Sequence, residues 1–175
     1  MANTYVAIAT VTVGSGGASS IAFSSIPGTY TDLLVKLSTR SNRSGDIIDA
    51  YGLRFNGDTG NNYSRLSLRG DGSAVSSNSN TGSYGYIDAF YMPAATATSN
   101  TFDNTEIYIP NYTSSNQKSI SLDNVSETNG TESYMTLAAD KWTGTAAITS
   151  ITFIVLNGTS FVQYSTATLY GIKNS

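Results

Sequence analysis

The chain has 175 residues, a formal net charge of −3, and neither His nor Cys. The missing residue types exclude a Ser-His-Asp triad, a Cys-His pair and the usual transition-metal ligand sets, and we expect no cofactor. Charged residues make up 12% of the chain, about half of the usual ~25%, whereas 12 Tyr and 6 Phe argue against disorder. A single folded domain spanning residues 1–175 is therefore predicted.

The basic residues form no stripe that would attract nucleic acid. Six of the nine fall between Lys36 and Arg69, but acidic residues are interleaved with them. The N-terminal stretch has no basic segment followed by an unbroken apolar run, and every apolar run is far shorter than the ~20 residues that span a bilayer. We therefore expect no nucleic-acid or membrane partner, and synthesis in the cytoplasm without a signal peptide.

Two strands are predicted at the N-terminus, after a short arm of about residues 1–5. Residues 5–13 alternate and are rich in β-branched side chains, and residues 20–24 form a second, shorter run. The Gly-rich segment between them indicates that the two strands pair as a hairpin.

The central part of the chain reads as strands separated by polar turns. After a strand at residues 32–39, residues 53–55 and 63–68 flank a dense run of turn residues at 56–62. One further short strand is expected around residues 74–76. More strands follow at residues 84–92, 102–109, 119–125 and 133–139.

The strand at residues 84–92 carries an aromatic cluster. Tyr84, Tyr86 and Phe90 have the same parity and should share one face, while Tyr91 points the other way. If that face points inward, it is core. If it points outward, it could stack on sugar rings or anchor a subunit interface, because Tyr is enriched in both.

The two longest strands are predicted at the C-terminus, at residues 148–156 and 161–172. Asn157-Gly158 between them is the strongest short hairpin signal. With about ten strands and no segment of helical periodicity, the chain is predicted to be an all-β antiparallel sandwich, jelly-roll-like rather than immunoglobulin-like.

Carboxylates are the chemistry that remains for catalysis or metal binding. Two pairs close in sequence, Asp46/Asp49 and Asp103/Glu106, could in principle serve a glycosidase, but solvated loop or strand-end residues are the commoner explanation, and we expect no enzyme. Asp58, in the turn at 56–62, is a weak calcium candidate because the turn lacks alternating carboxylates. A turn capped by its own Asn and Asp side chains is favoured.

Three blocks of the sequence resemble virion structural proteins of tailed bacteriophages, of the cyanobacterial and marine-phage type. The first two blocks are IPGTYTDLLVKLS (26–38) and LRFNGDTGNNYS (53–64). The third combines WTGTAAITSITF (142–153) with FVQYSTATLYGIK (161–173). These motifs are strand and turn signatures, so the resemblance implies a place in the virion but not which place.

The resemblance implies a capsid decoration (cement) protein on the capsid surface, since the chain has no long shaft as a whole tail fibre would. Its partners would be the major capsid protein and itself, as a homotrimer. We expect the interface at the N-terminal arm and the Tyr-rich strand, namely at Asn3, Tyr5, Tyr84, Tyr86 and Tyr91. The alternative is a receptor-binding or carbohydrate-binding module of a tail fibre, with a host glycan as ligand.

Overall fold

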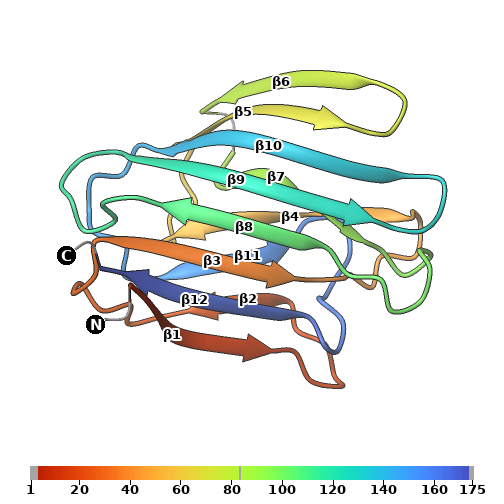
Figure 1. Ribbon diagram of the computed structural model, residues 1–175, viewed down its shortest axis with the longest axis horizontal. Coiled ribbons are helices and arrows are strands. Elements are labelled where there is room, and N and C mark those ends of the chain that lie inside the picture. The colour runs from red at the N-terminus through yellow and green to blue at the C-terminus, as the bar shows by residue number, and fades with distance from the viewer. Residues whose placement is uncertain (1–3, 83, 174–175) are drawn as a thin grey trace.

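The computed structural model describes residues 4–82 and 84–173, which form two antiparallel β-sheets packed face to face (Figure 1). The described residues contain no helix, so the predicted all-β sandwich is confirmed, with twelve strands where about ten were expected. In chain order they are β1 (Tyr5–Thr12), β2 (Ser20–Phe23), β3 (Asp32–Ser38), β4 (Ile48–Phe55), β5 (Tyr63–Gly70), β6 (Val75–Thr81), β7 (Ile87–Pro93), β8 (Asn104–Ile109), β9 (Lys118–Glu127), β10 (Ser133–Trp142), β11 (Ile151–Val155) and β12 (Thr166–Ile172).

The two sheets differ in size. The large sheet has eight strands in the order β1-β12-β3-β8-β9-β10-β5-β6, and the small sheet has four in the order β2-β11-β4-β7. Side chains that alternate along the facing strands fill the space between the sheets, as β9 shows by alternating buried and exposed over all ten of its residues.

Aromatic side chains form the centre of the core. Tyr51, Leu53 and Phe55 of β4 are fully buried. The ring of Tyr51 stacks on Phe90 of β7 with centroids 4.8 Å apart, and Phe153 of β11 meets both rings edge-on. Stacked and edge-to-face pairs of this kind are favourable beyond the apolar area that they bury. They join β4, β7 and β11 of the small sheet through side chains on its inner face.

Neither predicted terminal hairpin forms. β1 pairs with β12 in the large sheet, whereas β2 pairs with β11 in the small sheet, so the Gly-rich segment carries the chain across the sandwich. Asn157-Gly158 likewise connects β11 of the small sheet to β12 of the large one. Its turn is fixed by a distant side chain, since Asp49 of β4 accepts hydrogen bonds from the Asn157 amide and the Gly158 N–H.

The turn at residues 56–62 also crosses between sheets, from β4 to β5. Asn56 and Gly57 adopt positive φ angles of 52° and 68°. The Asn56 side-chain oxygen accepts hydrogen bonds from the backbone N–H groups of Thr149 and Ser150, which explains why Asn suits this position. The turn is therefore tied to the segment before β11 as well as to its own strands.

Candidate functional site

The large sheet extends past the small sheet on one side. β7 forms the edge of the small sheet and packs against β9, β10 and β5. β6 is the edge strand of the large sheet and lies beyond β5, at the top of Figure 1. It is exposed at every position except Asn80, which is half-buried. We call β5 and β6 the overhang. A strand that is exposed on both faces adds little to the core, so its role must lie elsewhere.

Six exposed apolar side chains gather on the outer surface of β9, β10 and the overhang. Their exposed fractions run from 40% to 78%. The strand register places Leu137 directly opposite Leu68 and Met135 directly opposite Val125. The six are Leu66, Leu68, Val75, Val125, Met135 and Leu137, and we call them the apolar face. Contiguous exposed apolar patches mark interaction surfaces in soluble proteins, whereas single exposed residues do not.

The apolar face covers only part of the outer surface of the large sheet. On β3 and β8 the same surface carries an ion pair between Lys36 and Glu106, whose charged atoms are 2.8 Å apart. Both side chains are about half exposed, and such an exposed pair contributes little to stability. The exposed aliphatic side chains thus lie on β9, β10 and the overhang, whereas the part of this surface around β3 carries Lys36 and Glu106 beside tyrosines.

Polar side chains occupy the opposite, inner surface of the overhang. Arg65 of β5 reaches across to β7 and donates hydrogen bonds to the carboxylate and the backbone oxygen of Asp88. The guanidinium of Arg69 donates to the Tyr91 hydroxyl and lies over the rings of Tyr91 and Tyr134, 5.5 and 4.7 Å from their centroids. These contacts attach the overhang to the edge of the small sheet.

Asn124 of β9 also contacts β7, the edge strand of the small sheet, through hydrogen bonds to its backbone. Its side-chain oxygen accepts a hydrogen bond from the Tyr91 N–H at 3.0 Å, and its amide donates to the Tyr91 carbonyl at 3.0 Å. One side chain thereby satisfies both backbone groups that a neighbouring strand would otherwise take. Edge strands are templates for unwanted pairing, so Asn124 protects β7 from it.

Asn124 also belongs to a buried polar network around Asp103. The Asp103 carboxylate accepts hydrogen bonds from the Thr39 N–H and hydroxyl and from the Tyr51 and Thr105 hydroxyls. The Asn124 amide donates to Thr105 as well. Burial raises the pKa of Asp103 to about 7, and the hydrogen bonds from Tyr51 and Thr39 oppose that shift.

Asp140 of β10 is a second buried carboxyl with a different environment. It is 2% exposed, and neither of its carboxyl oxygens has a hydrogen-bond partner. Burial raises the pKa of Asp140 to about 7, while the nearby Arg65 lowers it and Asp88 raises it further. A buried carboxyl without partners favours its neutral form, because ionisation would leave an unsolvated charge.

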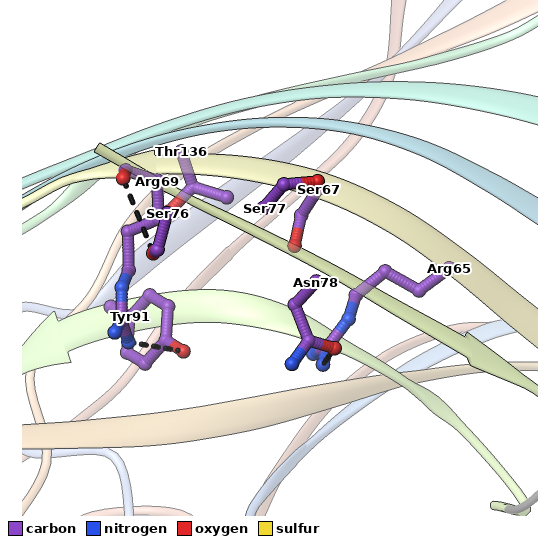
Figure 2. A pocket seen from close by; sticks show the side chains of 8 residues that line it. All are labelled: Arg65, Ser67, Arg69, Ser76, Ser77, Asn78, Tyr91 and Thr136. Atoms are coloured by element: carbon purple, nitrogen blue, oxygen red, sulfur yellow. Dashed lines mark hydrogen bonds between the residues drawn. The ribbon is translucent and has the colours of Figure 1, made fainter.

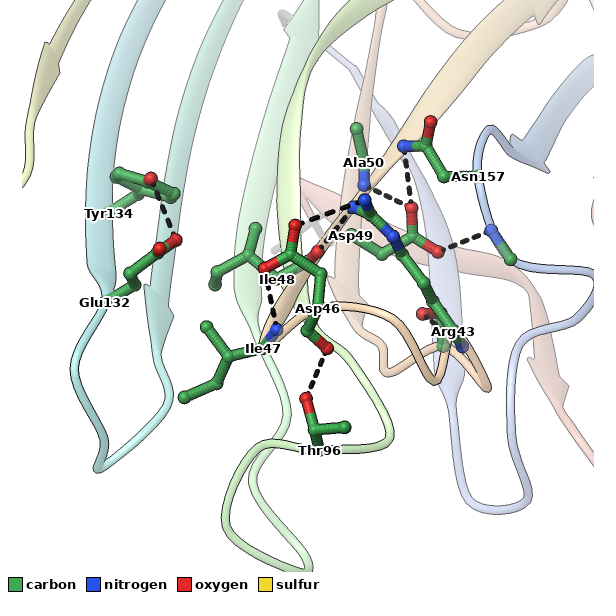
Figure 3. A network of polar contacts seen from close by, with 12 residues as sticks. Arg43, Asp46, Ile47, Ile48, Asp49, Ala50, Thr96, Glu132, Tyr134 and Asn157 are labelled. Atoms are coloured by element: carbon green, nitrogen blue, oxygen red, sulfur yellow. Dashed lines mark hydrogen bonds and ion pairs between the residues drawn. The ribbon is translucent and has the colours of Figure 1, made fainter.

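The acid pairs that the sequence suggested take separate partners. Asp46 forms an ion pair with Arg43 at 3.1 Å, while the buried Asp49 accepts hydrogen bonds from Asn157 and Gly158 (Figure 3). Each carboxylate of this pair is therefore occupied by structural contacts.

The second pair is divided between the two surfaces of the large sheet. Asp103 is buried in the network described above, and Glu106 lies on the outer surface with Lys36. In the described part of the chain, no group of three or more His, Cys, Asp or Glu residues could hold a metal ion.

Asp58, the weak metal candidate, caps its own turn. Its carboxylate accepts hydrogen bonds from the Gly60 N–H, the Asn62 amide and the indole N–H of Trp142. Burial alone would raise the pKa of Asp58, but the hydrogen bonds from Trp142, Asn62 and Gly60 lower it. The carboxylate is thus fully used in joining this turn to the end of β10.

We expect Asp58→Ala to lower the free energy of unfolding by about 1–2 kcal/mol, because Gly60 and the Trp142 indole lose their acceptor. Trp142 is the only tryptophan, so its fluorescence emission should shift to longer wavelength as water reaches the indole. Asp71→Ala is the matched control, since Asp71 caps a turn far from Trp142. Unchanged Trp142 emission in the Asp58 variant would contradict the assignment.

The predicted interface tyrosines do not form one surface. Tyr5 is exposed in β1, at the far edge of the large sheet from the overhang, and Asn3 lies outside the described residues. Tyr91 is half-buried under the overhang. Thr4, which belongs to the predicted arm, is joined to the residue after β12, because its carbonyl accepts a hydrogen bond from the Lys173 N–H.

The prediction that Tyr84, Tyr86 and Phe90 share a face is wrong. β7 begins only at Ile87, and its pairing with β4 contains an irregularity, so the alternation does not run through. Phe90 is core, whereas Tyr84 and Tyr86 stack on each other outside it, with ring centroids 5.5 Å apart. Tyr86 fits there because Gly52 leaves space below its ring.

The chain matches no family model, no curated protein and no solved structure. Within the described ranges there is no helix long and apolar enough to cross a membrane. The apolar face, the polar inner surface of the overhang and the buried carboxyls are therefore the features from which function has to be inferred.

Proposed function

We propose that this protein is a structural protein that works by docking its apolar face onto another protein. The observation that carries the proposal is the cluster of six large apolar side chains exposed on adjacent strands. Burying apolar surface contributes roughly 25 cal/mol per Å². A cluster of this kind is costly to leave in water and favourable to cover.

The strand order supports a jelly-roll core with two inserted hairpins. Without β5–β6 and β9–β10, the sheets reduce to β1-β12-β3-β8 and β2-β11-β4-β7. Those eight strands form two four-stranded sheets, and the chain changes sheet at every step except from β4 to β7, as expected of a jelly roll. All six residues of the apolar face lie on the two inserted hairpins. The insertions therefore carry the docking surface, and the eight-stranded core supports them.

A place in a phage virion is the specific form of this proposal. It is supported by the resemblance of residues 26–38, 53–64, 142–153 and 161–173 to virion structural proteins. A capsid decoration protein would use the apolar face against the major capsid protein, and a trimer would multiply modest contacts by raising their effective concentration. The Ser- and Asn-rich β6 suits such an interface, because uncharged polar groups cost less to bury than charges.

Binding to capsids stripped of decoration proteins tests the proposal. We expect the wild type to bind capsids made of the major capsid protein of the same phage. Leu68→Ser combined with Leu137→Ser should weaken binding at least ~10-fold, because two opposed apolar contacts are lost. Both residues are already more than half exposed, so the fold should survive, as a thermal melt would check.

Lys36→Ser is the control on the polar part of the same outer surface, and it should bind like the wild type. Equal binding by the double Leu variant would overturn the role of the apolar face. Binding of the wild type to host cells or glycans but not to capsids would favour the receptor-binding alternative. Sedimentation of the free protein tests the trimer separately.

A further inference from the structure

The inner surface of the overhang encloses a pocket that the apolar face does not involve. Its volume is about 170 Å³, larger than a cavity of ~150 Å³ that holds a benzene-sized ring. The lining comes from β5, β6, β7 and β10, with Arg65 and Arg69 pointing from β5 toward β7 (Figure 2). Ser67, Ser76, Asn78 and Thr136 supply hydroxyl and amide groups around them.

One of the two arginines that line the pocket forms no ion pair among the described residues. Arg65 is paired with Asp88, but none of the ion pairs among the described residues includes Arg69. The Arg69 guanidinium uses one nitrogen on the Tyr91 hydroxyl and rests against two aromatic rings. It is held in place with donors to spare, an arrangement that suits bidentate binding of a carboxylate.

Several polar atoms at the pocket are buried without a partner. The Thr136 hydroxyl is one, in a residue that is only 1% exposed, and the Nε atoms of Arg65 and Arg69 are two more. Buried polar groups in native proteins are nearly always hydrogen-bonded, so each unsatisfied one needs an explanation. Three of them lie in residues that line one pocket, so the wall of this pocket has hydrogen-bonding capacity that no described contact uses.

We propose that this pocket binds an acidic monosaccharide unit, with the sugar carboxylate on Arg69 and the sugar hydroxyls on Thr136, Ser67 and Asn78. Arg69, which forms no ion pair among the described residues, can pair with one carboxylate. The hydroxyl and amide groups both donate and accept, which matches the hydroxyl groups of a sugar ring. The volume matches one six-membered ring. The site uses the opposite surface of the strands that carry the apolar face, so it does not depend on the capsid-docking proposal.

Titration with D-glucuronate and D-galacturonate, followed by NMR of the arginine Nε–H signals, tests the site. We expect the Arg65 and Arg69 signals to shift saturably with a Kd of about 1 mM or tighter for at least one uronate. D-glucose, which lacks the carboxylate, and inorganic phosphate, which lacks the ring, should bind at least tenfold more weakly. Arg69→Gln should weaken uronate binding at least tenfold, while Arg43→Gln, a surface arginine elsewhere, should not.

Thr136→Val separates ligand binding from a structural role. Because the hydroxyl has no partner in the empty pocket, its isosteric replacement should raise the melting temperature of the free protein by about 2–4 °C. The same variant should bind the uronate more weakly. Absence of saturable shifts with either uronate, equal binding of glucose or phosphate, or unchanged binding by both pocket variants would each overturn the proposal and leave water as the occupant.

Discussion

We expect Asn124→Ala to lower the free energy of unfolding by about 3 kcal/mol. The substitution removes the side-chain partner of both backbone groups of Tyr91 and one of the partners of the Thr105 hydroxyl. Asn124 and Thr105 are fully buried. Leaving a buried donor or acceptor unsatisfied costs more than an average hydrogen bond contributes. The loss should also loosen the attachment between β9 and the edge of the small sheet.

Urea denaturation monitored by circular dichroism measures this loss. Asn104→Ala is the matched control, because Asn104 is exposed on the neighbouring strand β8, and it should change stability by no more than ~0.5 kcal/mol. Hydrogen exchange should report faster exchange of the Tyr91 amide in the Asn124 variant. A loss as small as that of the control would show that Asn124 does not hold the edge of β7.

We also expect the protein to become less stable as the pH rises from about 4 to 7. The pKa values of Asp103 and Asp140 are both raised to about 7 by burial, above the ~3.9 of an unfolded Asp. The folded state therefore binds more protons than the unfolded state across this interval, so stability falls as pH increases. The contribution of these two carboxyls to the free energy of unfolding is greatest below pH 4. It stops decreasing above pH 7.

Asp140→Asn should remove the Asp140 share of this pH dependence. A shift of about 3 pKa units corresponds to roughly 4 kcal/mol, an upper bound because water can enter as the group ionises, so we expect stabilisation of about 2–3 kcal/mol at pH 8. At pH 4, where the carboxyl is already neutral, the variant should differ little from the wild type.

Stability curves of the wild type and the variant at several pH values measure this effect. The groups that face Asp140 are Arg65 on β5 and Asp88 on β7. Asp123→Asn, on the exposed surface of β9, is the control and should leave the pH dependence unchanged. If Asp140→Asn lowered stability at pH 8, the carboxylate would be ionised and held by contacts, contrary to our account.

The sandwich could be predicted from the sequence. Which side chains of β5 point inward and which point to solvent could not. Leu66 and Leu68 share a parity that normally marks a core face, while Arg65, Ser67 and Arg69 share the other. In the structure, the polar set points inward and the apolar set points to solvent. The overhang lies beyond the small sheet and has no apolar core to face, which sequence periodicity cannot reveal.

Local signals also failed where distant residues decide the structure. Asn157-Gly158 has the composition of a hairpin turn, but Asp49 holds it as a connection between sheets. β6 was expected only as a short strand near residues 74–76, because Ser and Asn on both faces give no alternation. Asp140 is buried because β10 pairs with both β5 and β9. The residues next to Asp140 in the sequence do not indicate this pairing.

The alternation of β10 separates the residues that fold the protein from those that meet its surroundings. Ala138 and Trp142 are buried in the core, while Met135 and Leu137, earlier on the same strand, point to solvent. The residues of the apolar face could therefore be substituted, by evolution or by design, without disturbing the interior. Related chains should then diverge in partner choice faster than in architecture, and a combinatorial library at the six positions would offer a way to retarget the protein.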